Sequence, residues 1–172
     1  MVLGMSLSTF TLVHVLLSLV GIGSGLIVVY AMLTSKRLDG WTAVFLTTTV
    51  LTSVTGFLFP VEHILPSHKV GAISLVLLAI AILARYAFHL AGAWNRAYII
   101  TALMALYLNS FVGVVQAFEK SPALHALAPT QKEPPFAVAQ LVVLAVFIGI
   151  TVVAVRKAHS PALAGEKNKR AA

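Results

Sequence analysis

The chain has 172 residues, of which 59% are hydrophobic and 10% are charged. Because ordinary globular domains are about 45–50% apolar and about 25% charged, this composition excludes a soluble domain and indicates a membrane protein. The formal net charge is +7, but most basic residues flank apolar runs, so we expect the lipid bilayer, and not nucleic acid, as their partner. Cysteine is absent, which excludes disulfides and thiolate metal sites.

Apolar stretches near the length needed to cross a bilayer occur five times along the chain. They cover residues 10–33, 41–59, 70–90, 97–118 and 136–155. Since lipid offers no water to backbone groups, each stretch must be helical. The sequence therefore predicts an all-α, polytopic transmembrane helical bundle of about five spans, which forms one domain over residues 1–158. The basic tail, residues 159–172, is polar and expected to be disordered.

The distribution of lysine and arginine predicts the orientation. Lys36 and Arg37 lie in the first loop and Arg96 lies in the third, and five further basic residues follow the last apolar stretch, namely Arg156, Lys157, Lys167, Lys169 and Arg170. Cytoplasmic loops of membrane proteins carry such an excess. We therefore expect the N-terminus outside and the C-terminus in the cytoplasm.

The first predicted helix carries polar and small residues on one stripe, namely Thr11, His14, Ser18, Gly21 and Gly25. The two glycines form a GxxxG pair, which is typical of a face packed against other helices. His14 would then point into the bundle near its outer surface. Two interpretations stay open: a neutral imidazole hydrogen-bonded to a neighbouring helix, or a contact to a haem, a metal or a quinone.

The second helix places Thr48, Thr52 and Thr55 on one stripe that leads toward Glu62 and His63. Threonines in helices usually bond back to a carbonyl of their own helix, which would make this stripe ordinary packing. The alternative is a polar path toward the histidines, with Thr52 among its lining residues.

The segment "VEHILPSHK" gathers Glu62, His63 and His68 on the same side of the membrane as His14. Glu62, His63 and His68 are candidate ligands for a zinc or copper ion, although they match no stereotyped metal spacing. A b-type haem needs two histidines on different helices, so His14, His63 and His68 are candidate haem ligands. The alternative is a solvated turn.

The third helix begins near His68 and ends near His89, so these histidines face opposite sides of the bilayer and cannot share a ligand. Arg85 lies about one turn from the cytoplasmic end. We expect it to extend to the interface beside Tyr86. The alternative is an anchor for a lipid phosphate, a haem propionate or a quinone head.

The fourth helix contains Asn109, Ser110 and Gln116, which we expect to make interhelical hydrogen bonds or, alternatively, to bind a polar group of a substrate. The following loop contains "ALHALA" with His125, a candidate short interfacial helix. That loop is interpreted as a structured connection or as a lid over the outer histidines. Pro135 suits the first turn of the last helix.

Two resemblances follow from these segments. "LYLNSFVGVVQAF" with "HALAPTQKEPPF" resembles a family of small uncharacterised bacterial inner-membrane proteins. This resemblance implies a multi-pass protein of the bacterial inner membrane and no particular activity. "SHKVGAISLVLLAIAILARYAFH" is more faintly similar to small helical b-type cytochromes, although the wide separation of His68 and His89 departs from their mid-helix histidine pairs.

The sequence carries no catalytic motif of high specificity, so it does not decide whether the protein is an enzyme. The first functional hypothesis is an accessory or structural inner-membrane protein that contacts other membrane proteins. The second is an electron-transfer protein that holds haem b through the outer-side histidines and exchanges electrons with quinone. The third is a small-solute or metal carrier with Thr52, Asn109 and Gln116 along its path.

Overall fold

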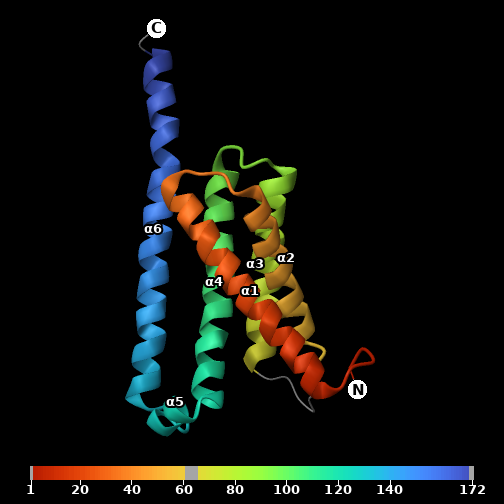
Figure 1. The fold of residues 1–172 in the computed structure, drawn as a ribbon. Helices are drawn as coiled ribbons and strands as arrows, with labels where there is room; N and C mark the ends of the chain where they lie inside the picture. The colour runs from red at the N-terminus through yellow and green to blue at the C-terminus, as the bar shows by residue number, and fades with distance from the viewer. Residues whose placement is uncertain (1, 61–65, 171–172) are drawn as a thin grey trace.

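The structure, a computed structural model, describes residues 2–60 and 66–170, with side chains through residue 158. Within these ranges the chain is helical, which confirms the predicted all-α class. The elements are α1 (Leu7–Thr34), α2 (Asp39–Gly56), α3 (Pro66–Ile82) with a π-helical continuation η1 (Leu83–Ala87), α4 (Ala93–Lys120), α5 (Pro122–Leu127) and α6 (Pro134–Arg170) (Figure 1).

Four helices in the described part are long and apolar enough to cross a membrane: Leu7–Thr34, Pro66–Ala87, Ala93–Lys120 and Pro134–Ala158. These helices support a membrane protein. The predicted second span, residues 41–59, is helical as α2, but α2 has only 18 residues and is rich in threonine. The fourth predicted span, in contrast, is one continuous helix of 28 residues despite its polar side chains.

The long helices lie side by side, with α4 at the centre of the bundle. α1 packs on α2, α3 packs on α4, and α6 packs mainly on α4. α1 and α3 run in the same direction, and α2 returns between them (Figure 1). We call the end with the N-terminus and α5 the α5 end, and the opposite end, with the α1–α2 connection, the basic end.

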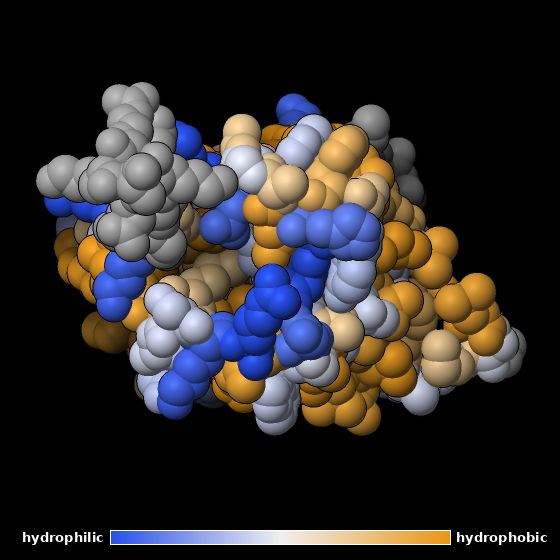
Figure 2. Space-filling model, turned by 90° about the horizontal axis from the view of Figure 1, so that it is seen from above, coloured by the Kyte–Doolittle hydropathy of each residue, from blue (hydrophilic) through white to orange (hydrophobic). Residues whose placement is uncertain are grey.

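The basic end is where the hydrophilic side chains gather when the bundle is seen from above, with hydrophobic side chains around them (Figure 2). Its exposed basic residues are Lys36, Arg37, Arg96, Arg156 and Lys157. Lys157 Nζ donates to the Leu33 carbonyl at 2.6 Å, near the C-terminus of α1. A cation favours the unsatisfied carbonyls at a helix C-terminus, so this contact joins α6 to α1.

The connection between α4 and α6 is ordered by a short helix and a capped turn. The predicted interfacial helix is present as α5. Glu133 accepts hydrogen bonds from the Thr130 hydroxyl at 2.8 Å and from the Lys132 N–H at 3.0 Å. These bonds lower the pKa of the Glu133 carboxyl, and the bond from the Thr130 hydroxyl has the largest effect. Pro134 and Pro135 then occupy the first turn of α6, as the sequence predicted for Pro135.

The glycine face of α1 lies in close contact with α2 and α4. A Cβ atom at Gly25 would lie 2.5 Å from Leu106 Cδ1 and 3.0 Å from Phe45 Cδ2. At Gly21 it would lie 3.1 Å from both Asn109 Nδ2 and Thr49 Oγ1. The predicted packing role of this glycine pair is thus confirmed.

Replacing Gly25 by valine is expected to destabilise the bundle. Leu106 and Phe45 are each only 1% exposed and have no free space to retreat into, so the overpacking should lower the free energy of unfolding by about 1–3 kcal/mol. Thermal unfolding in mild detergent measures this change. Gly23→Val is the matched control on the same helix, because a Cβ there meets no atom within 4 Å. Equal melting temperatures for the two variants would contradict the packing role.

Candidate functional site

A cavity of about 580 Å³ lies among α1, α2, α3 and α4 and extends from the middle of the bundle to the α5 end. This volume is in the range of small-molecule sites, about 300–1,000 Å³. Five of the candidate site residues predicted from the sequence line it: His14, Thr52, His68, Asn109 and Gln116. Residues from four separate segments thus converge on one space.

His14 lies on the α1 wall of the cavity. Its Nδ1 is 2.8 Å from the Thr55 hydroxyl oxygen of α2, and its ring meets the Phe59 ring edge-on at 5.2 Å between centroids. The Thr55 hydroxyl also lies 2.7 Å from the Leu51 carbonyl oxygen. The imidazole is therefore fixed by an interhelical hydrogen bond, which is the first of the two arrangements expected from the sequence.

His68 lies on the first turn of α3 and lines the same cavity, with its ring 5.4 Å from the Phe57 ring. His14 and His68 therefore line one cavity. Glu62 and His63 lie outside the described residues. Among the residues that are described, no group of three histidine, cysteine, aspartate or glutamate side chains is arranged to hold a metal ion. The metal site at Glu62, His63 and His68 stays a prediction.

Asn109 occupies the inner part of the cavity. Its side chain is 8% exposed, accepts a hydrogen bond from the Ser18 hydroxyl at 2.8 Å, and donates to the Ser18 carbonyl at 3.4 Å. This is the interhelical bond expected from the sequence. Ser110, in contrast, bonds back to the Leu106 carbonyl of its own helix at 2.9 Å.

The α2 wall of the cavity is formed by hydroxyls that bond within their own helix. The Thr52 hydroxyl donates to the Thr48 carbonyl at 2.9 Å, as ordinary threonine packing predicts. The Ser53 hydroxyl lies 3.0 Å from the Thr49 carbonyl and 3.2 Å from the Ser74 hydroxyl of α3. Sequence analysis missed this serine pair, since two serines 21 residues apart give no local pattern.

The mouth of the cavity is more polar and more exposed than its interior. Gln116 donates to a Glu119 carboxylate oxygen at 3.2 Å, and Lys120 stands one residue further along α4. His125 is exposed on α5, and no residue of α5 lines the cavity. The arrangement of this loop as a lid over the histidines is therefore not found.

Toward the basic end the interior is filled by buried apolar side chains. Phe45, Leu78, Leu103 and Leu106 are each 2% exposed or less. None of them lines the cavity. The polar residues Thr52, Asn109 and Gln116 thus border a closed-ended space in this conformation.

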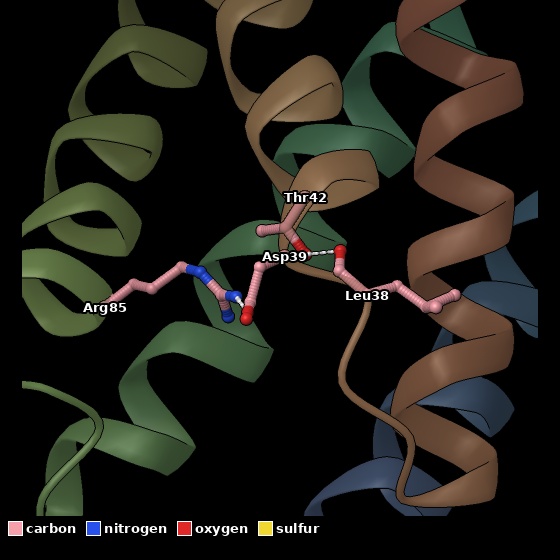
Figure 3. Close-up of polar contacts among 4 residues, drawn as sticks. All are labelled: Leu38, Asp39, Thr42 and Arg85. Carbon is pink, nitrogen blue, oxygen red and sulfur yellow. Dashed lines mark hydrogen bonds and ion pairs between the residues drawn. The ribbon is translucent and has the colours of Figure 1, made fainter.

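Arg85 lies far from the cavity, at the basic end. Its guanidinium pairs with the Asp39 carboxylate at the start of α2 (Figure 3). It also lies 5.8 Å from the Tyr86 ring, the expected neighbour, and 5.4 Å from the Tyr98 ring. The Asp39 side chain is 74% exposed, so the ion pair itself contributes little, about 0–1 kcal/mol. The sequence did not reveal Asp39, because 46 residues separate the two partners.

Comparison of the chain with models of known protein families, with curated proteins and with solved structures finds no match. The assignment of a function therefore depends on the geometry of the cavity.

Proposed function

We propose that the protein is an integral membrane protein that binds a small amphipathic molecule in the cavity among α1 to α4, as an accessory to other membrane proteins. The observation that supports this proposal most strongly is that His14, His68 and Asn109, from three helices, line one cavity of about 580 Å³ whose walls are otherwise mainly apolar. Convergent polar groups in an apolar pocket are the usual form of a small-molecule site.

Ligand binding is favoured over packing alone because the polar groups are held in place by other residues. His14 is fixed by Thr55 and Asn109 is fixed by Ser18, so each side chain already has a partner on one side. The cavity is open on the other side. Groups held rigidly by second partners are preorganised, so a ligand orders few side chains when it binds.

A larger residue at Gly113 is expected to block the site. Gly113 lines the cavity, and a Cβ atom there meets only Ile22 Cδ1, at 3.4 Å, so the helix tolerates a side chain that projects into the space. Gly113→Leu should weaken the binding of a ring-bearing amphiphile such as 4-hexylphenol at least about tenfold, which corresponds to a steric penalty of about 1–3 kcal/mol. The ligand-dependent rise in melting temperature of the protein in lipid nanodiscs measures the affinity.

The matched control for this experiment is Gly149→Leu on α6. A Cβ atom at Gly149 meets no atom within 4 Å, and Gly149 does not line the cavity. It should bind 4-hexylphenol like the unmodified protein. Binding that is absent from the unmodified protein, or equal in both variants, would reject the site.

We further propose that α2 crosses the membrane, which gives five spans in a bacterial inner membrane, with the N-terminus outside and the C-terminus in the cytoplasm. The parallel course of α1 and α3 supports this proposal, because the chain has to return between them along α2. At 1.5 Å per residue, a helix of 18 residues is about 27 Å long, close to the hydrocarbon thickness. The basic residues at one end then face the cytoplasm.

The absence of native cysteine makes this topology directly testable. Cysteine introduced at Ser35, at the basic end, should react with a membrane-impermeant maleimide only after spheroplasts are opened. Cysteine introduced at Ala123, on α5, should react in intact spheroplasts. Both sites are exposed. Reaction of both on the same side would contradict the five-span arrangement.

A second candidate function is electron transfer through haem b and quinone. The observation that favours it is that His14 and His68 come from different helices and line one cavity. Because His14 Nδ1 contacts Thr55, only its Nε2 is available to a haem iron. A haem would supply one-electron redox chemistry, and Lys120 at the mouth is a cation suited to a propionate.

This candidate predicts a coloured protein. The chain purified in mild detergent from haem-sufficient cells should show a Soret band that shifts on reduction with dithionite. His14→Ala should abolish that spectrum if His14 is an axial ligand. A colourless protein would reject haem binding, whereas an unchanged spectrum in His14→Ala would reject only this ligand.

A further inference from the structure

Three hydroxyl groups on the α1 and α2 walls of the cavity direct their hydrogens to acceptors inside the protein. A hydroxyl carries one hydrogen and two lone pairs. The hydrogen of Ser18 is directed to Asn109 Oδ1 at 2.8 Å, that of Thr52 to the Thr48 carbonyl at 2.9 Å, and that of Thr11 to the Leu7 carbonyl at 2.8 Å. What these side chains can still offer to a ligand is the lone pairs of their oxygens.

The hydrogen bonds around His14 indicate that its ring, too, offers a hydrogen-bond acceptor to the cavity. The Thr55 hydroxyl has carbonyl acceptors of its own helix at 2.7 Å and 3.1 Å, to which its hydrogen is directed. Its oxygen therefore accepts the bond from His14, which places a hydrogen on His14 Nδ1. In the neutral imidazole the other nitrogen, Nε2, then carries a lone pair and accepts hydrogen bonds.

The remaining walls favour an uncharged aromatic ring. The described lining residues include no aspartate or glutamate, so a cationic ligand would meet no opposite charge, and the one lysine, Lys120, stands at the exposed mouth. The rings of Phe57 and Phe59 line the cavity together with those of His14 and His68. Aromatic rings pack well edge-on or offset against such walls.

The cavity also borders the lipid-facing surface. Val15 and Leu19 line it, yet they are 37% and 59% exposed on the outside of α1. In a membrane that outer surface is covered by acyl chains. An apolar tail can therefore leave the cavity sideways, while a polar head stays near His14.

We infer, on the basis of the proposed binding function, that the ligand is an uncharged aromatic amphiphile with a hydrogen-bond-donating hydroxyl: a phenol, or the reduced quinol form of a quinone. Its hydroxyl donates to His14 Nε2, its ring packs against the aromatic wall, and its tail passes Val15 and Leu19 into the lipid. The oxidised quinone has only acceptor oxygens and therefore cannot donate to His14 Nε2.

A pair of ligands that share ring and tail, and of which only one has a hydrogen-bond donor, tests this inference. 4-Hexylphenol and 4-hexylanisole have the same ring and tail, but the methoxy group of the anisole has no hydrogen to donate. The phenol should bind the full chain in nanodiscs about tenfold more tightly, the effect of one hydrogen bond to an otherwise unpaired acceptor. In His14→Phe, which keeps a ring of similar shape but no acceptor, this preference should fall below about twofold.

The outcomes separate the inference from the proposed function. Equal binding of the two ligands to the unmodified protein, with Gly113→Leu blocking both, would overturn the inference and leave the binding function intact. Loss of specific binding for both ligands would reject the function itself. A phenol preference that persists in His14→Phe would overturn the role of His14. The comparison of the two ligands on the unmodified protein requires no variant, so it decides the question even where a variant does not fold.

Discussion

A polar group inside a bilayer finds no water, so each hydroxyl, amide and imidazole has to bond within the protein. In this chain that constraint determines how α1 sits on its neighbours. His14 bonds Thr55 of α2 and Ser18 bonds Asn109 of α4. Between these bonds and the basic end, Gly21 and Gly25 have no side chains that would hold the helices apart.

The same contact explains why there is a cavity beside it. α1 crosses the other helices obliquely, and helices that cross at an angle diverge on either side of their closest approach (Figure 1). At the two glycines, α1 lies in close contact with α2 and α4. Toward the basic end, Phe45 and Leu106 fill the space, whereas toward the α5 end the cavity is bordered by apolar side chains, glycines, hydroxyl side chains and His14. These side chains do not fill the gap, so a space remains whose walls are mainly apolar and carry a few polar groups.

Features that depend on local pattern were predictable from the sequence, and features that depend on long-range pairing were not. Hydropathy located every long helix, and helical spacing identified the face with His14, Gly21 and Gly25. Of the five predicted spans, α2 fits the composition of a membrane span least, because the threonines along its length lower its hydropathy. The Arg85–Asp39 pair joins residues 46 positions apart, which no local pattern reveals. The sequence likewise predicted that His14 and His68 lie on the same side of the membrane, but only the packing of the helices shows that they line one cavity.

Polar side chains are paired differently at the basic end and in the cavity, and this difference bears on function. At the basic end, Arg85 is a permanent charge, and it is satisfied by Asp39 and by two tyrosine rings where water is within reach. In the cavity, the groups held by hydrogen bonds are neutral, and they are satisfied on the protein side but open on the other. A charge in that position would be costly to desolvate and would require a fixed counter-ion.

Neutral groups with unused lone pairs have a smaller desolvation penalty when the site is empty, and they gain a hydrogen bond when a neutral donor enters. A reversible ligand arriving from the lipid needs this balance, because a site that is too costly when empty would collapse, and one that is fully satisfied would bind nothing.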